Sequence, residues 1–260
     1  MHARRNPSAE RGAPVHSRLV PFLFDACSFR YSRRIPVLEQ LNLKLRPGCS
    51  ALLGPGGAGK STVLGLAAAA LVPRSGSVRY RGLDACEERD RHRYRQSVGL
   101  LPQESRPIPG LTVREQVSYA GGLKGMTRAD AWERAEWALD RVGLRGLRDR
   151  RSHLLSRAQL RRVGVAEVLV HDADVILMDE PMAGLDAEPA AQFRSLMGDL
   201  GSELSVVVSA ARIDDLDGVN GALYDEVVVL DQGTLRYQGP AKGAAKFLPP
   251  VTEARRTLCG

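Results

Sequence analysis

The chain has 260 residues, which suits one large domain or one domain with an inserted subdomain. Its four cysteines lie far apart without C-x-x-C spacing, so neither a zinc site nor a disulfide scaffold is indicated and a reducing, cytoplasmic environment is expected. The formal charge of +7 is concentrated in arginine-rich segments without interleaved aromatic residues, which favours a solvated or membrane-proximal basic face over nucleic-acid binding.

The two basic segments lie at the N-terminus and in the middle of the chain. Residues 1–21 are polar, rich in arginine and without hydrophobic periodicity, so we expect a flexible basic tail. This tail lacks the apolar stretch of a signal peptide, and no run in the chain approaches the ~18 apolar residues that cross a bilayer. Residues 145–162 form the second segment, in which Asp149 is the only acidic residue.

The first predicted elements are strands. Residues 22–31 alternate in a strand-like way, and Leu41, Leu43 and Leu45 recur at every second position before Pro47-Gly48 ends the run. Residues 49–53 are typical of a short buried strand, and residues 62–69 predict an apolar helix. The loop between this strand and this helix therefore lies at a helix N-terminus, where anions are stabilised.

That loop carries the complete pattern G-x-x-x-x-G-K-[ST], which reads Gly-Pro-Gly-Gly-Ala-Gly-Lys-Ser-Thr over residues 54–62. Its glycines let the backbone turn tightly and direct successive amide N–H groups at one point. Lys60 supplies a mobile cation for the outer phosphates of a nucleotide, and the Ser61 hydroxyl can bind the accompanying magnesium ion. The alternative is a glycine-rich turn that contains Lys-Ser by chance, and the complete pattern in its strand-to-helix context argues against it.

The middle of the chain predicts a helical insert. Residues 77–81 and 98–101 predict strands, and residues 84–96 a short exposed helix or loop. Thr112-Val113-Arg114-Glu115 is a capping-box sequence, residues 127–142 predict a second helix, and Ser156 can cap a third. We expect a helical subdomain inserted at about 105–170, with Trp132 and Trp137 in its core.

The last third returns to alternating strands and helices. Strands are predicted at 175–178, 206–208 and 227–230, a helix begins after Asp186, and Gln232-Gly233 marks the turn of a final hairpin. This alternation implies an α/β P-loop NTPase core, with antiparallel N-terminal strands, a mainly parallel sheet and helices on both of its faces. We expect one domain at 22–248, followed by a C-terminal tail at 249–260.

Two carboxylates follow the strand at 175–178. Asp179 stands where a phosphate-loop NTPase places the carboxylate that holds the water shell of magnesium. Glu180 is placed one residue further on, where it can act as a general base toward the water that attacks the γ-phosphate. An Asp-Glu-Pro turn after a strand is ordinary by itself, but a full phosphate loop upstream favours the catalytic interpretation.

In these features the chain resembles the ATP-binding subunits of ABC transporters over residues 22–248. The resemblance implies that Tyr31 stacks on adenine and that Gln103 links the metal site to the helical insert. It also implies that residues 183–186 cross a dimer interface, and that Leu155-Ser156-Arg157-Ala158-Gln159 is the signature segment, whose Ser156 meets the γ-phosphate held by a partner subunit. Residues 101–104, 111–115 and 123–125 look most like the drug- and antibiotic-export branch.

The predicted site residues form three sets. The catalytic set is Glu180, Gln103 and Lys60; the metal set is Ser61, Gln103 and Asp179; the nucleotide-binding set is Tyr31, Gly54, Pro55, Gly56, Gly57, Ala58, Gly59, Lys60, Ser61, Thr62 and Ser156. ATP and Mg²⁺ are the ligands that the resemblance implies.

The chain departs from the family pattern at two motifs. Arg157 and Ala158 replace the two glycines of the signature segment, so side chains stand where close backbone approach is expected. Two outcomes are compatible with this replacement: the side chains obstruct closure of the dimer, or the Arg157 guanidinium reaches the phosphate as a substitute donor. Ala211 replaces the switch histidine, and alanine can neither donate nor accept a proton. Because Glu180 is retained, these departures leave binding intact and predict slower hydrolysis.

Three functions are compatible with this pattern. The first is an ATPase subunit, peripheral on the inner face of the cell membrane, that drives a separately encoded membrane-spanning exporter and dimerises with an identical or a different ATP-binding subunit. The second is a degenerate regulatory subunit that clamps ATP without significant turnover. The third, a soluble ABC protein that acts on ribosomes or DNA, would need tandem nucleotide domains or long coiled-coil insertions, and neither is found in the sequence. We rank them in this order.

Overall fold

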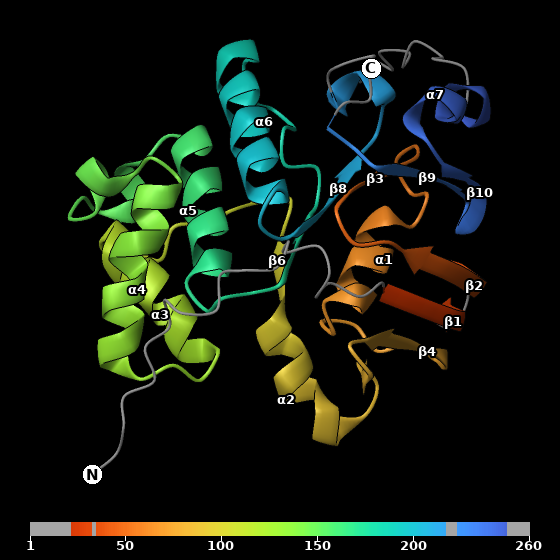
Figure 1. The fold of residues 1–260 in the computed structure, drawn as a ribbon, viewed down its shortest axis with the longest axis horizontal. Helices are drawn as coiled ribbons and strands as arrows, with labels where there is room; N and C mark the ends of the chain where they lie inside the picture. Colours follow the sequence, from red (N-terminus) through yellow and green to blue (C-terminus); the bar gives the residue numbers. More distant parts are fainter. Residues whose placement is uncertain (1–21, 33–34, 217–222, 249–260) are drawn as a thin grey trace, which may run out of the picture.

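The structure is a computed structural model that describes residues 22–32, 35–216 and 223–248, so both predicted tails lie outside the described residues. Its strands form two sheets (Figure 1). An antiparallel sheet has the order β2-β1-β4-β5, and a six-stranded sheet has the order β10-β9-β3-β8-β7-β6. The strands are β1 Phe22–Phe29, β2 Leu38–Leu45, β3 Cys49–Leu53, β4 Ser75–Tyr80, β5 Leu83–Asp84, β6 Val98–Leu101, β7 Val175–Met178, β8 Ser205–Ala210, β9 Glu226–Asp231 and β10 Thr234–Gly239.

Helices surround the larger sheet. They are α1 Lys60–Ala67, α2 Glu88–Ser97, α3 Val113–Leu123, α4 Arg128–Arg141, α5 Arg157–Leu169, α6 Ala187–Gly201 and α7 Ala241–Ala244, with 3-10 turns at Arg145–Leu147, Ser152–Leu154, Ile213–Leu216 and Ala245–Phe247. Helix α1 begins at Lys60, two residues before the predicted start, so the phosphate-loop lysine and serine belong to its first turn. No helix among the described residues is long and apolar enough to span a membrane.

The six-stranded sheet is parallel except for its last strand. Strands β6, β7, β8, β3 and β9 run in one direction, and β10 pairs antiparallel with β9. In the register, Leu53 of β3 faces both Ala210 of β8 and Val229 of β9, and Leu101 of β6 faces Met178 of β7. The predicted α/β class, with a parallel sheet and antiparallel N-terminal strands, is confirmed.

Alternate residues of the central strands feed two hydrophobic cores. Leu52 of β3 and Leu177 of β7 join the core that holds α1 and the antiparallel sheet. Ala51 and Met178, which point the other way, join the core that holds α5 and α6. Because helices or strands cover both faces, these strands are apolar throughout instead of alternating with polar residues.

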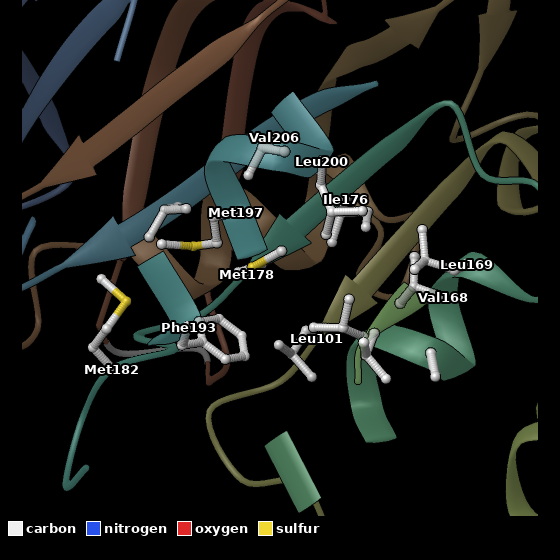
Figure 2. Packing of buried hydrophobic residues seen from close by; sticks show 14 of the residues in the cluster. Leu101, Val168, Leu169, Ile176, Met178, Met182, Phe193, Met197, Leu200 and Val206 are labelled. Carbon is white, nitrogen blue, oxygen red and sulfur yellow. The ribbon is translucent and has the colours of Figure 1, made fainter. Parts of the chain in front are cut away.

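The second core is drawn in Figure 2, where Phe193 and Met197 of α6 lie beside Met178 of β7. In the same core, the side chain of Leu101 at the end of β6 lies over Gly164 of α5, and Val168 of α5 lies over Gly99 of β6. Apolar packing therefore fixes α5 against the last residue of the edge strand, immediately before the segment that carries Gln103.

Helices α3, α4 and α5 pack on one another and stand to one side of the sheets (Figure 1). Their N-termini form as the sequence predicts, because reciprocal capping boxes join Thr112 to Glu115 and Ser156 to Gln159, and the Thr127 hydroxyl accepts a hydrogen bond from the amide of Asp130. The bounds of a helical subdomain, about 105–170, stay a prediction.

The prediction that Trp132 and Trp137 lie in the core is wrong. Their side chains are 44% and 39% exposed. The guanidinium groups of Arg114 and Arg134 each lie 4.2 Å from one indole ring, so cation–π contacts take the place of apolar packing.

The predicted basic face at residues 145–162 is also wrong in part. Arg148 forms an ion pair with Glu136 of α4 at 2.8 Å, a partner outside that segment of the sequence. Arg161 is only 4% exposed, because it lies on the side of α5 that meets the chain after β6. Helical periodicity alone cannot show that this side of α5 packs against backbone carbonyl oxygens.

Candidate functional site

The predicted site residues come together at one edge of the six-stranded sheet. Because β3, β6, β7 and β8 are parallel, the segments that follow them leave the sheet on the same side. The phosphate loop follows β3, Gln103 follows β6, Asp179 and Glu180 follow β7, and Ala211 follows β8. These segments are spread over residues 54–211 of the sequence, and strand register brings them together.

The phosphate loop needs glycine at its two ends. A Cβ on Gly54 would run into the carbonyl oxygen of Leu230 on β9, so the loop leaves β3 only by a close backbone approach. Gly59 has φ of 98°, in the left-handed region, and forms the N-cap of α1. These two conformations turn the chain from strand into helix and leave the outer face of Gly56 and Gly57 open.

Lys60 is directed back into the loop. Its side chain is only 5% exposed, and Nζ donates hydrogen bonds to the carbonyl oxygens of Gly54 at 2.7 Å and Pro55 at 3.1 Å. Nζ also lies 3.4 Å from Oε1 of Glu180. The lysine therefore joins the loop after β3 to the carboxylate after β7.

Glu180 is held at its backbone and at its side chain. Its φ is 42°, in the left-handed region that non-glycine residues seldom adopt. Its amide donates to Oγ of Ser209 at 2.9 Å, and the same Oγ donates to Oδ1 of Asp179 at 2.6 Å. Ser209 thus fixes the angle between the two acidic residues from the neighbouring strand β8.

Gln103 closes this arrangement on the far side. Its Nε2 donates to Oε2 of Glu180 at 3.1 Å, so the two carboxylate oxygens of Glu180 face Gln103 and Lys60 respectively. Glu180 therefore contacts both other residues of the predicted catalytic set, Lys60 and Gln103. The metal set is less compact, because Ser61 is exposed on α1 and, within the part of the chain that the structure describes, forms no hydrogen bond with Asp179 or Gln103.

Tyr31 and Ser156 are the most distant predicted nucleotide ligands. The Tyr31 ring is exposed, packs edge-on against Phe29 at 4.9 Å between ring centroids, and its hydroxyl lies 3.3 Å from Oγ1 of Thr62. The Ser156 hydroxyl caps α5 by accepting from the amide of Gln159, so in this chain it serves the helix. A role for Ser156 at a second chain's site stays a prediction.

The two departures from the family pattern have distinct surroundings. Nη1 of Arg157 lies 3.4 Å from the carbonyl oxygen of Gly184, so the substituted signature residue contacts the loop at 183–186 of its own chain. Ala211 is half-buried after β8. His171 does not replace the missing histidine, because its Nδ1 contacts the carbonyl oxygen of Gln96, before the start of β6.

Sequence reasoning missed two contributors. Ser209 is absent from the predicted site residues, although a small polar residue at the end of the strand beside β7 is a usable signal. Arg161 was counted among exposed arginines, and nothing in the sequence marks its contact with the carbonyl oxygens of Pro102 and Gln103.

A buried polar pair lies behind the segment that follows Gln103. Gln116 of α3 donates from Nε2 to Oε1 of Glu167 on α5 at 2.7 Å and to the carbonyl oxygen of Arg106 at 3.2 Å, and its Oε1 accepts from the amide of Ile108 at 2.9 Å. Burial raises the pKa of the Glu167 carboxyl from 4.5 to about 7, and the hydrogen bond from Gln116 opposes that rise. The pair fastens two helices to residues 106–108.

This raised pKa predicts a pH-dependent effect of Glu167→Gln. The folded chain binds the Glu167 proton more tightly than the unfolded chain, so the stabilisation is complete below about pH 4.5 and is lost as the pH rises through about 7. Glutamine cannot ionise and keeps an acceptor for Gln116. Relative to wild type, the variant should gain up to about 3 kcal/mol between pH 4.5 and 8.5, since one pKa unit corresponds to about 1.4 kcal/mol. Urea unfolding at both pH values measures this gain, and a constant difference would contradict it.

The residues at this edge fit a magnesium nucleotide. The open face of Gly56 and Gly57 leaves room for phosphate oxygens, and α1 directs its N-terminus at that face. A hydroxyl from Ser61, a carboxylate from Asp179 and an amide from Gln103 are oxygen ligands of the kind that Mg²⁺ prefers.

Comparison with known proteins identifies the family. The model of the ABC transporter family matches residues 38–183. The phosphonates import ATP-binding protein PhnC 2 of a Synechococcus species is 34% identical over 83% of this chain and 84% of its own length. The methionine import ATP-binding protein MetN 2 of Burkholderia mallei is 32% identical over 90% of this chain, which spans only 58% of that protein.

A solved structure shows the same fold. The cbiO1 protein of Clostridium perfringens, part of the ABC transporter complex cbiONQ, superposes with a TM-score of 0.76 at 26% identity and covers 88% of this chain and 91% of its own. ABC ATP-binding domains bind ATP with Mg²⁺, the two ligands that the sequence predicts. With its matching family model, its relatives above 30% identity and its phosphate-loop geometry, the chain belongs to the ABC transporter family of ATP-binding domains.

Proposed function

We propose that this chain is an ATPase subunit that binds MgATP and couples its hydrolysis to transport through a separate membrane-spanning partner, at the inner face of the cell membrane. The observation that carries the proposal is the contact of Glu180 with both Lys60 and Gln103 beside Asp179. A binding-only protein does not require a carboxylate held between a phosphate-loop lysine and a metal-side amide.

Each residue has a distinct role in this proposal. The amides of the phosphate loop and Lys60 bind the phosphates, and Tyr31 supports adenine. Ser61, Gln103 and Asp179 hold the magnesium ion. Glu180 accepts the proton of the attacking water, because Ser209 holds its backbone amide and Lys60 and Gln103 hold its carboxylate.

A second ATP-binding subunit completes the proposed enzyme. The Ser156 hydroxyl lies at the N-terminus of α5, which it caps, and the family resemblance assigns the phosphate that it meets to another chain. Closure of two subunits on ATP and their opening after hydrolysis would move the membrane partner.

The direction of transport has support on both sides. The sequences at residues 101–104, 111–115 and 123–125 resemble those of the drug- and antibiotic-export branch, which supports export. The names of the phosphonate and methionine relatives support import, and we keep import as the competing direction. Vesicles that contain the membrane partner, loaded or bathed with substrate, distinguish the two by the side on which substrate accumulates.

A regulatory subunit is the second candidate function. The Arg157 guanidinium at Gly184 favours it, because a side chain bound to its own chain stands where a partner's γ-phosphate would approach. In that case the chain would bind ATP tightly and turn it over only at the rate of an inactive variant.

Steady-state ATP hydrolysis by the purified chain, alone and with its membrane partner, tests the proposal. We expect Mg²⁺-dependent phosphate release that the partner stimulates, and binding of a fluorescent ATP analogue in both preparations. Binding without release above the background of Glu180→Gln would overturn the enzyme and support the regulatory subunit.

A further inference from the structure

The segment that carries Gln103 is held by side chains of the helices. After β6, residues 102–108 lie outside the strand ladder, and four of their carbonyl or amide groups are bound by Arg161 and Gln116. Arg161 contacts the carbonyl oxygens of Pro102, at 3.2 Å, and of Gln103, and Gln116 binds at Arg106 and Ile108. Side chains of α3 and α5 therefore set the path of this segment.

Arginine is an unusual residue for a buried contact with backbone carbonyl oxygens. The Arg161 side chain is almost fully buried, and among the residues that the structure describes it forms no ion pair with a carboxylate. A buried cation is costly unless its donors are satisfied, and here backbone carbonyl oxygens satisfy Nη1. A neutral side chain would avoid the desolvation cost. We therefore attribute the presence of the guanidinium group to its hydrogen bonds with the carbonyl oxygens of Pro102 and Gln103.

The backbone of Gln103, which Arg161 holds, belongs to the residue whose side chain contacts the carboxylate of Glu180. The carbonyl oxygen of Gln103 accepts from Arg161, while the side chain of the same residue donates to Oε2 of Glu180 at 3.1 Å. These contacts connect α5 to the backbone of Gln103, and through that residue to the amide that faces Glu180.

We propose that Arg161 is a positioning residue that places Gln103 against Glu180 and transmits the position of α5 to the site. This inference rests on the proposed ATPase function for its effect on turnover. Its effect on the Gln103 segment does not depend on turnover and can be measured separately.

The next residue along α5 provides a matched control. Arg162 donates to the carbonyl oxygen of Val142 at 3.2 Å and to Oε1 of Gln192 at 3.0 Å. Arg162 has the same side chain and lies on the same helix as Arg161, but it holds the end of α4 to α6 instead of the Gln103 segment.

Hydrogen exchange in the nucleotide-free chain tests the structural half. In Arg161→Gln, amides of peptides that cover residues 102–106 should exchange at least fivefold faster than in wild type, and in Arg162→Gln they should not change. Arg161→Lys keeps the charge but has one ammonium group in place of the planar guanidinium, so its amide exchange rate should be intermediate. This variant also serves as the test if Arg161→Gln fails to fold. Equal exchange in the Arg161 and Arg162 variants would overturn the inference.

A double-mutant cycle tests the catalytic half. Arg161→Gln should lower kcat about five- to tenfold with the Kd for ATP unchanged, Gln103→Ala should lower kcat by at least as much, and the double variant should be no slower than Gln103→Ala alone. Independent, multiplying effects would show that Arg161 acts by another route and would refute the assignment. If wild type does not hydrolyse ATP, the proposed function fails, while the exchange experiment still decides the role of Arg161.

Discussion

Replacing Glu180 by glutamine should lower kcat for ATP hydrolysis by about 10²- to 10⁴-fold, the range for loss of a general base. Glutamine has the same shape and can still accept a hydrogen bond from Gln103, but it cannot take a proton from water. Lys60 keeps its hydrogen bonds to the carbonyl oxygens of Gly54 and Pro55, so the phosphate loop should retain its conformation. The loss should therefore appear in turnover and not in binding.

Phosphate release at saturating MgATP and titration with a fluorescent ATP analogue measure the two quantities. Glu133→Gln provides the control, since Glu133 is exposed on α4 and the same chemical change there should leave kcat unaltered. If Glu180→Gln hydrolyses ATP at more than a tenth of the wild-type rate, the base is another group and the assignment of Glu180 fails.

Combining Arg157→Gly, Ala158→Gly and Ala211→His should raise turnover at least tenfold. The two glycines restore close backbone approach at the signature segment and remove the guanidinium group that contacts Gly184. The histidine supplies a donor and acceptor after β8, on the strand beside that of Glu180. One recovered charge-assisted hydrogen bond of about 1.5 to 3 kcal/mol would alone account for a tenfold or larger gain.

The steady-state rate of the triple variant should be compared with those of the glycine pair and of Ala211→His alone. Each partial variant should recover part of the gain, and the thermal midpoint should confirm that all three are folded. An unchanged rate in the triple variant would mean that residues 155–159 and 209–211 do not correspond to the family motifs.

The sequence predicts the parts of this fold that local patterns encode. The apolar runs at 49–53, 98–101 and 175–178 become strands with those bounds, because burial on both faces requires continuous hydrophobicity. The capping residues Thr112 and Ser156 also act as predicted, because a cap involves only neighbours three residues apart.

Contacts between distant segments are not encoded in this way. Arg161 reads as one more basic residue on a helix, and its acceptors lie 58 and 59 positions away in a loop without periodicity. Ser209 is bound to a carboxylate 30 positions earlier. The phosphate loop and the acidic pair can be predicted as motifs, whereas the side chains that hold them against each other require the sheet register.

The order of strands divides the site into a stiff and a compliant half. Lys60 follows β3, which has a parallel neighbour on each side, and Asp179 follows β7, which also lies between two strands. Gln103 follows β6, an edge strand, which among the described residues is paired along one side only. The phosphate-binding elements are therefore anchored in the middle of the sheet, and Gln103 stands on the margin that bends most readily. A force applied through the helices should displace Gln103 while the phosphate-binding loop stays in place.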